Sequence, residues 1–194
     1  MDDTHQLRPP VILADLETGT RAVGFKLASD PLTGALLRTL AASKPGGRLL
    51  EIGTGTGMGT AWLLAGMDAG ATLLSIENDA RFLDVARRCL GDDSRVTFRQ
   101  ADAACVLAEL PKSSFDLIFA DTWAGKYTHL EEALSLLAPG GLYVVDDMLP
   151  QSTWPEGHAE KAARLVAELD AREDLVVTKM CWATGIILAV KRGV

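Results

Sequence analysis

Four glycines at alternate positions constrain this chain more than any other feature of its sequence. They are Gly53, Gly55, Gly57 and Gly59, within the segment LLEIGTGTGMGTAWLLA of residues 49–65. An apolar run precedes them and a helical pattern follows, so the segment predicts a buried strand, a tight loop and a helix. A glycine-rich loop at this place lets the backbone approach a ligand closely.

Short apolar runs alternate with amphipathic stretches along the chain. We expect strands at 48–52, 72–76, 96–100, 115–121, 141–147, 175–180 and 185–190, and helices at 58–69, 79–90, 103–110 and 127–137. This alternation predicts an α/β fold, a Rossmann-like three-layer sandwich around a mostly parallel seven-stranded sheet. The last two strands are joined only by residues 181–184, too few for a parallel crossover, so one strand near the C-terminus is expected to be antiparallel.

The 194 residues suit a single main domain. Ser29 or Asp30 can cap a helix that begins at Pro31, which places the main domain at residues 29–194. Residues 1–28 then form an N-terminal helical extension.

The charge and the apolar runs of the chain indicate which kinds of partner it can bind. The net charge is −7 and the isoelectric point about 4.9, which disfavours nucleic acid and favours a small-molecule ligand. The start MDDTHQLRPP has no apolar core, and the longest apolar run, near CWATGIILAV, is too short to span a bilayer. We therefore expect a soluble, cytoplasmic protein without a membrane partner.

Two carboxylates indicate which class of ligand the glycine loop binds. The spacing departs from the dinucleotide pattern G-x-G-x-x-G, and no Gly-Lys-Ser/Thr of a triphosphate loop is present. Glu51, two residues before Gly53, would repel a pyrophosphate but attract an ammonium group. Glu77, at the end of the second strand, can accept both hydroxyls of a ribose. A ligand with a ribose and a positive charge fits, and S-adenosylmethionine is such a ligand.

The motif E-x-G-x-G-x-G, the acid ending the second strand, QADA at 100–103 and FADTW at 119–123 together resemble a class I S-adenosylmethionine-dependent methyltransferase. The resemblance covers roughly residues 30–190 and includes a reversed final strand. It implies that the cofactor contacts Glu51, Gly53, Thr54, Gly55, Gly57, Glu77, Asn78, Asp102, Ala103, Asp121 and Trp123.

Among these enzymes, DTWAGKY at 121–127 and VVDDMLP at 144–150 are most similar to the oxygen methyltransferases of the catechol and caffeoyl-coenzyme A type. The resemblance implies a small, phenolic acceptor and a divalent cation such as Mg²⁺ on Asp121, Asp146 and Asp147. Oxygen ligands suit such a cation, which lowers the acceptor pKa. The position of the family's lysine base holds Ala124, so Asp121 and Lys126 are the catalytic candidates.

Other bases and other functions stay open. His129 and His158 are further candidates for the base, and Met148 and Trp154 for the wall of an acceptor pocket. The rival functions are a nicotinamide-dependent oxidoreductase, a cofactor-binding module that has lost catalysis, and a nucleic-acid methyltransferase. The absence of a [DN]-P-P-[YFW] motif after the fourth strand argues against nitrogen acceptors.

The N-terminal extension is short for a lid over the acceptor. Either the acceptor is large and open to solvent, or a second subunit closes the site in a homodimer. Its apolar residues Leu13, Leu16, Val23 and Phe25 offer surface for such a contact, or pack on their own domain.

Overall fold

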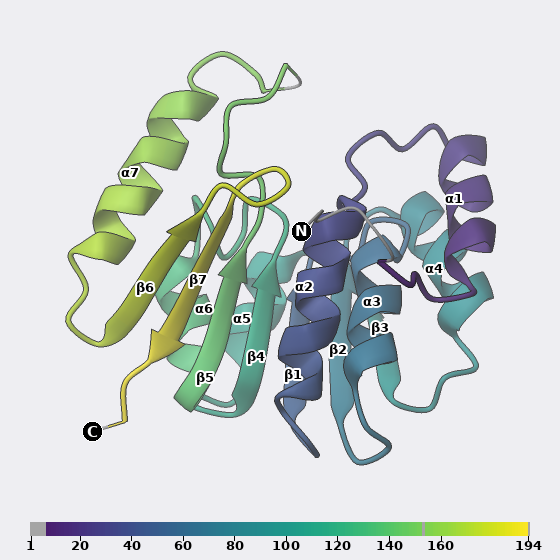
Figure 1. The fold of residues 1–194 in the computed structure, drawn as a ribbon, viewed down its shortest axis with the longest axis horizontal. Coiled ribbons are helices and arrows are strands. Elements are labelled where there is room, and N and C mark those ends of the chain that lie inside the picture. Colours follow the sequence, from purple (N-terminus) through teal and green to yellow (C-terminus); the bar gives the residue numbers. More distant parts are fainter. Residues whose placement is uncertain (1–6, 153, 194) are drawn as a thin grey trace.

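A computed structural model describes residues 7–152 and 154–193 of the chain. Its centre is a seven-stranded sheet with the order β3-β2-β1-β4-β5-β7-β6 (Figure 1). The strands are β1 (Arg48–Ile52), β2 (Thr72–Glu77), β3 (Val96–Gln100), β4 (Phe115–Ala120), β5 (Leu137–Val145), β6 (Leu175–Met180) and β7 (Ile186–Lys191). Pairings among β1 to β5 are parallel, whereas β7 is antiparallel to both β5 and β6. The predicted mostly parallel sheet with one reversed strand is confirmed.

Helices cover both faces of the sheet. Those in the described residues are α1 (Leu13–Ala22), α2 (Pro31–Ala42), α3 (Met58–Gly66), α4 (Ala80–Leu90), α5 (Ala103–Glu109), α6 (Leu130–Leu136) and α7 (His158–Asp170). Figure 1 shows α2 and α3 in front of the sheet and α5 and α6 behind it. Successive strand residues serve opposite cores: Leu49 packs with the helices α1 to α4, and Leu50 with α5 to α7. This alternation of side chains is what buries a parallel strand on both faces.

The elements differ from the predicted ranges mainly at two sites, and in addition α7 lies outside the predicted helix ranges. The predicted helix 127–137 is confined to Leu130–Leu136, because residues 123–129 form turns and His129 adopts a left-handed backbone with φ of 56°. The predicted strand 141–147 begins at Leu137 and ends at Val145. Asp146 and Asp147 therefore follow the strand, and Asp147 has a positive φ of 62°.

Helices α2 and α3 approach each other closely because glycines lie at their contact. A Cβ at Gly34 would lie 2.3 Å from the Trp62 indole, and one at Gly66 would lie 2.0 Å from the Arg38 carbonyl oxygen. Trp62 itself is only 1% exposed. The two glycines thus allow the close approach of α2 and α3.

Replacing Gly66 by alanine is expected to lower the free energy of unfolding by about 1–3 kcal/mol, the usual cost of overpacking. The added methyl group meets backbone, which cannot rotate away. Urea unfolding followed by circular dichroism measures the change. Gly70→Ala is the matched control, since a Cβ there would lie at an ordinary 3.5 Å from the Gly46 Cα; equal stability of the two variants would contradict the expectation.

The described part of the N-terminal extension packs on its own domain, while residues 1–6 lie outside the described residues. Leu13 and Leu16 are buried in the core that contains α3 and α4. The Thr20 hydroxyl is 2.7 Å from that of Thr56 in the glycine loop, so the extension contacts the loop directly. Of the two uses weighed for the apolar residues, packing within the chain is the one observed.

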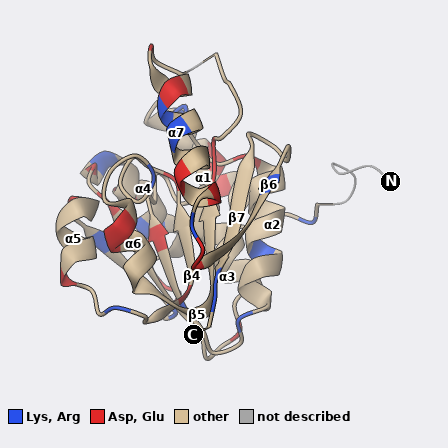
Figure 2. Cartoon of the chain, turned by 90° about the vertical axis from the view of Figure 1, so that its left-hand side faces the viewer, with Lys and Arg blue, Asp and Glu red and all other residues tan. Residues whose placement is uncertain are grey.

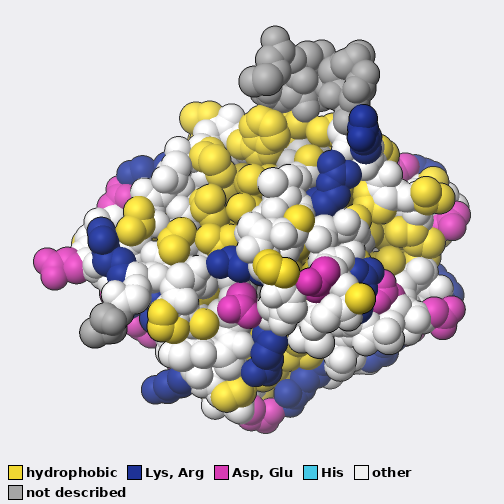
Figure 3. All heavy atoms as spheres, turned by 60° about the horizontal axis from the view of Figure 1, so that its bottom comes forward, with side chains coloured by type: hydrophobic (Ala, Val, Ile, Leu, Met, Phe, Trp, Pro, Cys, Tyr) yellow, Lys and Arg dark blue, Asp and Glu magenta, His cyan; other side chains and the backbone are white. Residues whose placement is uncertain are grey.

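The charged side chains are of both signs. Figure 2 shows both Lys or Arg and Asp or Glu on the helices that cover the sheet. The face away from the carboxyl ends of the strands carries scattered charged and hydrophobic side chains (Figure 3). Among the described residues, no helix is both long and apolar enough to cross a membrane.

Candidate functional site

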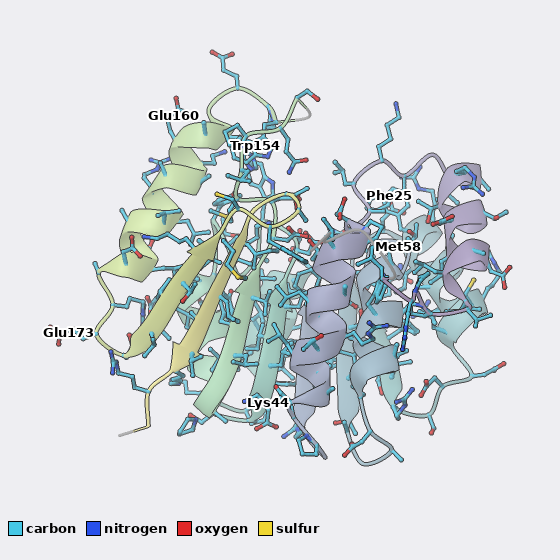
Figure 4. All side chains as sticks on the ribbon, viewed as in Figure 1. Phe25, Lys44, Met58, Trp154, Glu160 and Glu173 are labelled. Atoms are coloured by element: carbon cyan, nitrogen blue, oxygen red, sulfur yellow. The ribbon has the colours of Figure 1, made fainter. Side chains whose placement is uncertain are left out.

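Two adjoining cavities lie where β1, β2, β4 and β5 end. Carboxyl ends of parallel strands meet at one edge of a sheet, which is where α/β proteins bind ligands. The first cavity has a volume of about 330 Å³ and the second about 280 Å³. Gly53, Glu77, Thr122 and Trp123 line both. Figure 4 shows Phe25 and Trp154, which line the first cavity, reaching the upper edge of the sheet from its two sides.

The glycine loop lines the first cavity, and three of its backbone N–H groups already donate within the chain. The N–H groups of Gly53 and Thr54 both donate to the Ile76 carbonyl oxygen at 3.0 Å. The Gly55 N–H donates to a Glu77 carboxylate oxygen at 2.8 Å. A pyrophosphate would need such N–H groups free. These three N–H groups are therefore not free for a pyrophosphate, and the glycine spacing also departs from the dinucleotide pattern.

Positions 53 and 55 of the loop require glycine for two reasons, the backbone conformation and the close approach of neighbouring atoms. Both have positive φ, 100° and 53°. A Cβ at Gly53 would lie 2.8 Å from the Asp121 carbonyl oxygen, and one at Gly55 would lie 2.9 Å from the Phe25 ring. Phe25 in turn packs on Phe82, with ring centroids 4.6 Å apart. The segment before α2 thus covers the loop.

Glu77 lies between the cavities. Besides the Gly55 N–H, its carboxylate accepts the N–H groups of Asn78 and Asp79 at 2.9 and 3.0 Å. These bonds fix the side chain at the end of β2 while it still lines both cavities. The carboxylate is therefore held where the sequence placed a ribose contact.

Glu51 is buried beneath the loop and lines neither cavity. It is 0% exposed, and the hydroxyls of Thr60 and Ser75 donate to one of its oxygens. Burial raises the pKa of Glu51 to about 7, against the lowering effect of the Ser75 and Thr60 hydrogen bonds and with a further rise from the Glu77 charge. Its other oxygen is buried and has no hydrogen-bond partner among the described residues.

The second cavity gathers several of the residues predicted to contact the cofactor. Asn78, Asp102 and Ala103 line it together with Trp123. Asp102 also caps α5, accepting the Ala104 N–H at 2.9 Å. His129 lines this cavity and not the first, so it lies apart from the other candidate bases.

Three aspartates and a lysine meet in the first cavity. Asp121 follows β4, Asp146 and Asp147 follow β5, and all three line the cavity with Lys126. Loss of water contact raises the pKa of Asp121 well above its usual value; the Lys126 charge opposes this, and the Asp146 and Asp147 charges add to it. Burial likewise raises the pKa of Asp146. Lys126, 5% exposed, donates to the Asp146 carbonyl oxygen at 2.7 Å.

The predicted metal ligands are close in the fold but do not form a ligand set. In residues 7–152 and 154–193, no group of three or more His, Cys, Asp or Glu is arranged to hold a metal ion. Donors of the chain already occupy one oxygen of each carboxylate: the Ser29 hydroxyl on Asp121, the Thr184 hydroxyl on Asp146 and the Gln151 amide on Asp147. The donor set does not fit a divalent cation, which prefers several converging oxygens.

Aromatic side chains form the outer wall of the first cavity. Tyr127 and His158 are joined by a hydrogen bond of 3.0 Å between the phenol and Nε2. The Trp154 ring lies 4.5 Å from that of His158, and Trp123 meets Tyr127 edge-on at 5.9 Å. Burial lowers the pKa of His158, and the Lys126 and Lys161 charges lower it further. Met148, by contrast, packs against the core.

Some residues of the site were not expected from the sequence. Ser29, considered as a helix cap, donates to Asp121 at 3.0 Å, while Asp30 caps α2. Thr184 and Gln151 hold Asp146 and Asp147. Each lies far along the chain or across a turn from its partner, and no local pattern marks these pairs.

Comparisons with known proteins agree with this architecture. Residues 50–148 match a family model described as a methyltransferase domain. A relative from Mycobacterium avium (strain 104), named "Putative O-methyltransferase", is 32% identical over 177 residues, covering 84% of this chain and 78% of the relative.

Two solved structures share the fold. The O-methyltransferase TomG from Streptomyces achromogenes, in complex with S-adenosylmethionine, superposes with a TM-score of 0.84 at 24% identity, covering 98% of this chain and 94% of TomG. A "putative caffeoyl-CoA O-methyltransferase" from Staphylococcus aureus gives a TM-score of 0.80 at 18% identity, covering 97% and 96% of the two chains. The chain therefore belongs to the class I S-adenosylmethionine-dependent methyltransferases, together with its O-methyltransferase relatives.

Proposed function

We propose that this chain transfers the methyl group of S-adenosylmethionine to an oxygen of a small aromatic molecule. The observation that carries the proposal is the pair of adjoining cavities with Glu77 between them. One cavity has a carboxylate and small residues suited to a nucleoside, and the other has an aromatic wall. A nucleoside-bearing donor and a flat acceptor would meet at their common border.

In this proposal the second cavity takes the adenine, beside Asn78, Asp102 and Ala103. Glu77 accepts the ribose hydroxyls. Trp123, which is 48% exposed and borders both cavities, offers its ring to the adenine or to the acceptor. The amino-acid part of the donor then lies along the glycine loop in the first cavity.

The glycine loop with Gly53, Thr54, Gly55 and Gly57 faces the amino-acid part. Glu51 acts on it from beneath: its oxygen accepts from Ser75, whose hydroxyl is 2.5 Å from that of Thr54 in the loop. We thus assign Glu51 to holding the loop, with its charge favouring the ammonium group above it.

The acceptor lies in the first cavity between Asp121 and the aromatic wall. S-adenosylmethionine supplies an electrophilic methyl group on a sulfonium. The acceptor oxygen forms its bond to the methyl carbon as the carbon–sulfur bond breaks, and its proton passes to a base on the chain. Asp121 is the group we assign as that base, with the Lys126 ammonium stabilising the developing negative oxygen. Alignment of the two reactants supplies much of the rate.

A single phenol, a vicinal diphenol and a larger phenolic compound are the acceptors to compare. Release of S-adenosylhomocysteine across such a panel, with Mg²⁺ and with EDTA, tests the proposal. Turnover of an aromatic hydroxyl supports it; tight binding of NADH without binding of S-adenosylhomocysteine would overturn it. Phe25 and Trp154 both line the first cavity, and a homodimer stays a prediction.

Replacing Glu77 by alanine is expected to weaken S-adenosylhomocysteine binding by about 1–3 kcal/mol, the scale of a lost charged hydrogen bond. Isothermal titration calorimetry measures the change. Glu109→Gln is the control, because Glu109 is an exposed partner of Arg99 away from both cavities. Affinity in Glu77→Ala equal to that of the control would refute this placement of the ribose.

A further inference from the structure

The carboxylate cluster of the first cavity contains a cation that belongs to the chain. The turn after β4 folds back so that Lys126 is buried beside Asp146 at the end of β5. Its ammonium group donates to the Asp146 carbonyl oxygen at 2.7 Å. Asp121, Asp146 and Asp147 line the same cavity as Lys126, although its ammonium group forms no salt bridge with their carboxylates among the described residues.

The other contacts hold these carboxylates in orientations set by the protein. Ser29 donates to Asp121 at 3.0 Å, and Gln151 donates to Asp147 at 2.6 Å. The same oxygen of Asp146 accepts both the Thr184 hydroxyl at 2.5 Å and the Asp147 N–H at 2.7 Å. A small divalent cation would need these oxygens to converge in near-octahedral geometry at about 2.0–2.1 Å. Each carboxylate keeps one oxygen outside these hydrogen bonds, but in the described residues the three carboxylates are not arranged to converge on one metal ion.

We propose that the Lys126 ammonium is the resident cation of this cluster and takes the electrostatic place of a divalent metal ion. The inference rests on the proposed function and deepens it by naming an acceptor class. A metal ion can chelate two adjacent hydroxyls, whereas an ammonium is a compact point charge with three N–H donors, one of which Lys126 uses on the Asp146 carbonyl oxygen. The acceptors of this site therefore need only one ionisable aromatic hydroxyl, and a second, adjacent hydroxyl is not chelated by a metal ion.

Binding of Mn²⁺, followed by electron paramagnetic resonance, tests the cation directly without any turnover. The wild-type protein and Lys126→Arg, which keep a fixed positive charge, are expected to show no saturable Mn²⁺ site in the millimolar range. Lys126→Met keeps the apolar stem but removes the charge, and it is expected to bind one Mn²⁺ per chain at least tenfold more tightly than wild type. Lys161→Met is the matched control: Lys161 lies over the Trp123 ring at 4.1 Å, outside the cluster, and its loss should leave Mn²⁺ binding unchanged.

A saturable one-to-one Mn²⁺ site in the wild-type protein overturns the proposal by itself, and this titration needs no variant. A folded Lys126→Met that binds Mn²⁺ no better than wild type also overturns it. Thermal unfolding of each variant establishes that it is folded.

Titration of S-adenosylhomocysteine into the same preparations separates this inference from the proposed function. Failure of S-adenosylhomocysteine to bind would refute the proposed function. The Mn²⁺ result would still show which cation compensates the negative charge of the three aspartates. If S-adenosylhomocysteine binds and the Mn²⁺ titration gives the expected result, EDTA should leave the turnover of single phenols unchanged. Vicinal diphenols should then react no more than tenfold faster than single phenols. If EDTA abolishes turnover and added Mg²⁺ restores it, the inference about Lys126 is overturned. The proposed methyltransferase function would still stand.

Discussion

Replacing Glu51 by glutamine is expected to stabilise the protein by up to about 3 kcal/mol at pH 8 and by much less at pH 5. Glu51 is fully buried, and its pKa is raised from 4.5 to about 7, chiefly by loss of water. A shift of this size corresponds to about 3 kcal/mol, at about 1.4 kcal/mol for each pKa unit. Glutamine resembles the protonated carboxyl and does not ionise.

The direction in which the free energy of unfolding changes with pH follows from which state releases the Glu51 proton first. Below pH 4.5 the carboxyl is protonated in the folded and the unfolded state alike. As the pH rises toward 7, the unfolded state releases the proton first, so the free energy of unfolding falls until the folded carboxyl also ionises. The wild-type protein should therefore lose this stability between pH 4.5 and 7, and Glu51→Gln should keep it.

Urea unfolding at several pH values measures the free energy of unfolding of wild type and Glu51→Gln. Taking the difference between the two proteins cancels the contributions of other titrating groups. Glu132→Gln, a change of an exposed side chain, is the control. A difference between Glu51→Gln and wild type that is the same at pH 5 and pH 8 would mean that Glu51 is ionised throughout.

Replacing Gly53 by alanine is expected to weaken S-adenosylhomocysteine binding by about 100-fold or more, or about 3 kcal/mol. The residue has a φ of 100°, which costs about 1–3 kcal/mol for other residues. In addition, its Cβ would lie 2.8 Å from the Asp121 carbonyl oxygen. Since Gly53 and Asp121 both line the first cavity, relief of this contact must move a wall of the site.

Gly140→Ala separates the conformational cost from the contact. Gly140 also has a positive φ, 75°, but a Cβ there would have no atom within 4 Å. Both variants should lose stability in thermal unfolding, and only Gly53→Ala should lose affinity in calorimetry. Unchanged affinity in Gly53→Ala would place the cofactor away from this loop.

Much of the fold could be predicted because its signals are local. Buried strands carry apolar runs, and the short link at residues 181–184 by itself requires the antiparallel pairing of β6 and β7. Glu77 and Asp102 each end a strand or begin a helix, so their places at the sheet edge followed from the order of elements.

The interior of the site could not be predicted in the same way. Ser29 and Asp121 are 92 positions apart and meet only because α2 packs beside the sheet. Lys126, expected from its sequence context at the start of a helix, is buried because residues 123–129 form turns that fold back toward β5.

The chain's pattern of apolar runs, glycines and strand-end acids was thus enough to predict a mostly parallel sheet and the location of its ligand edge, since these depend on periodicity and element order; the methyltransferase class followed from the resemblance of its motifs to that family. Burial of Glu51, the hydrogen bonds that hold the aspartates and the charge of Lys126 among them were decided by tertiary structure. The physical reason is that solvation and electrostatic interaction depend on distances in space, which residues remote in sequence determine together.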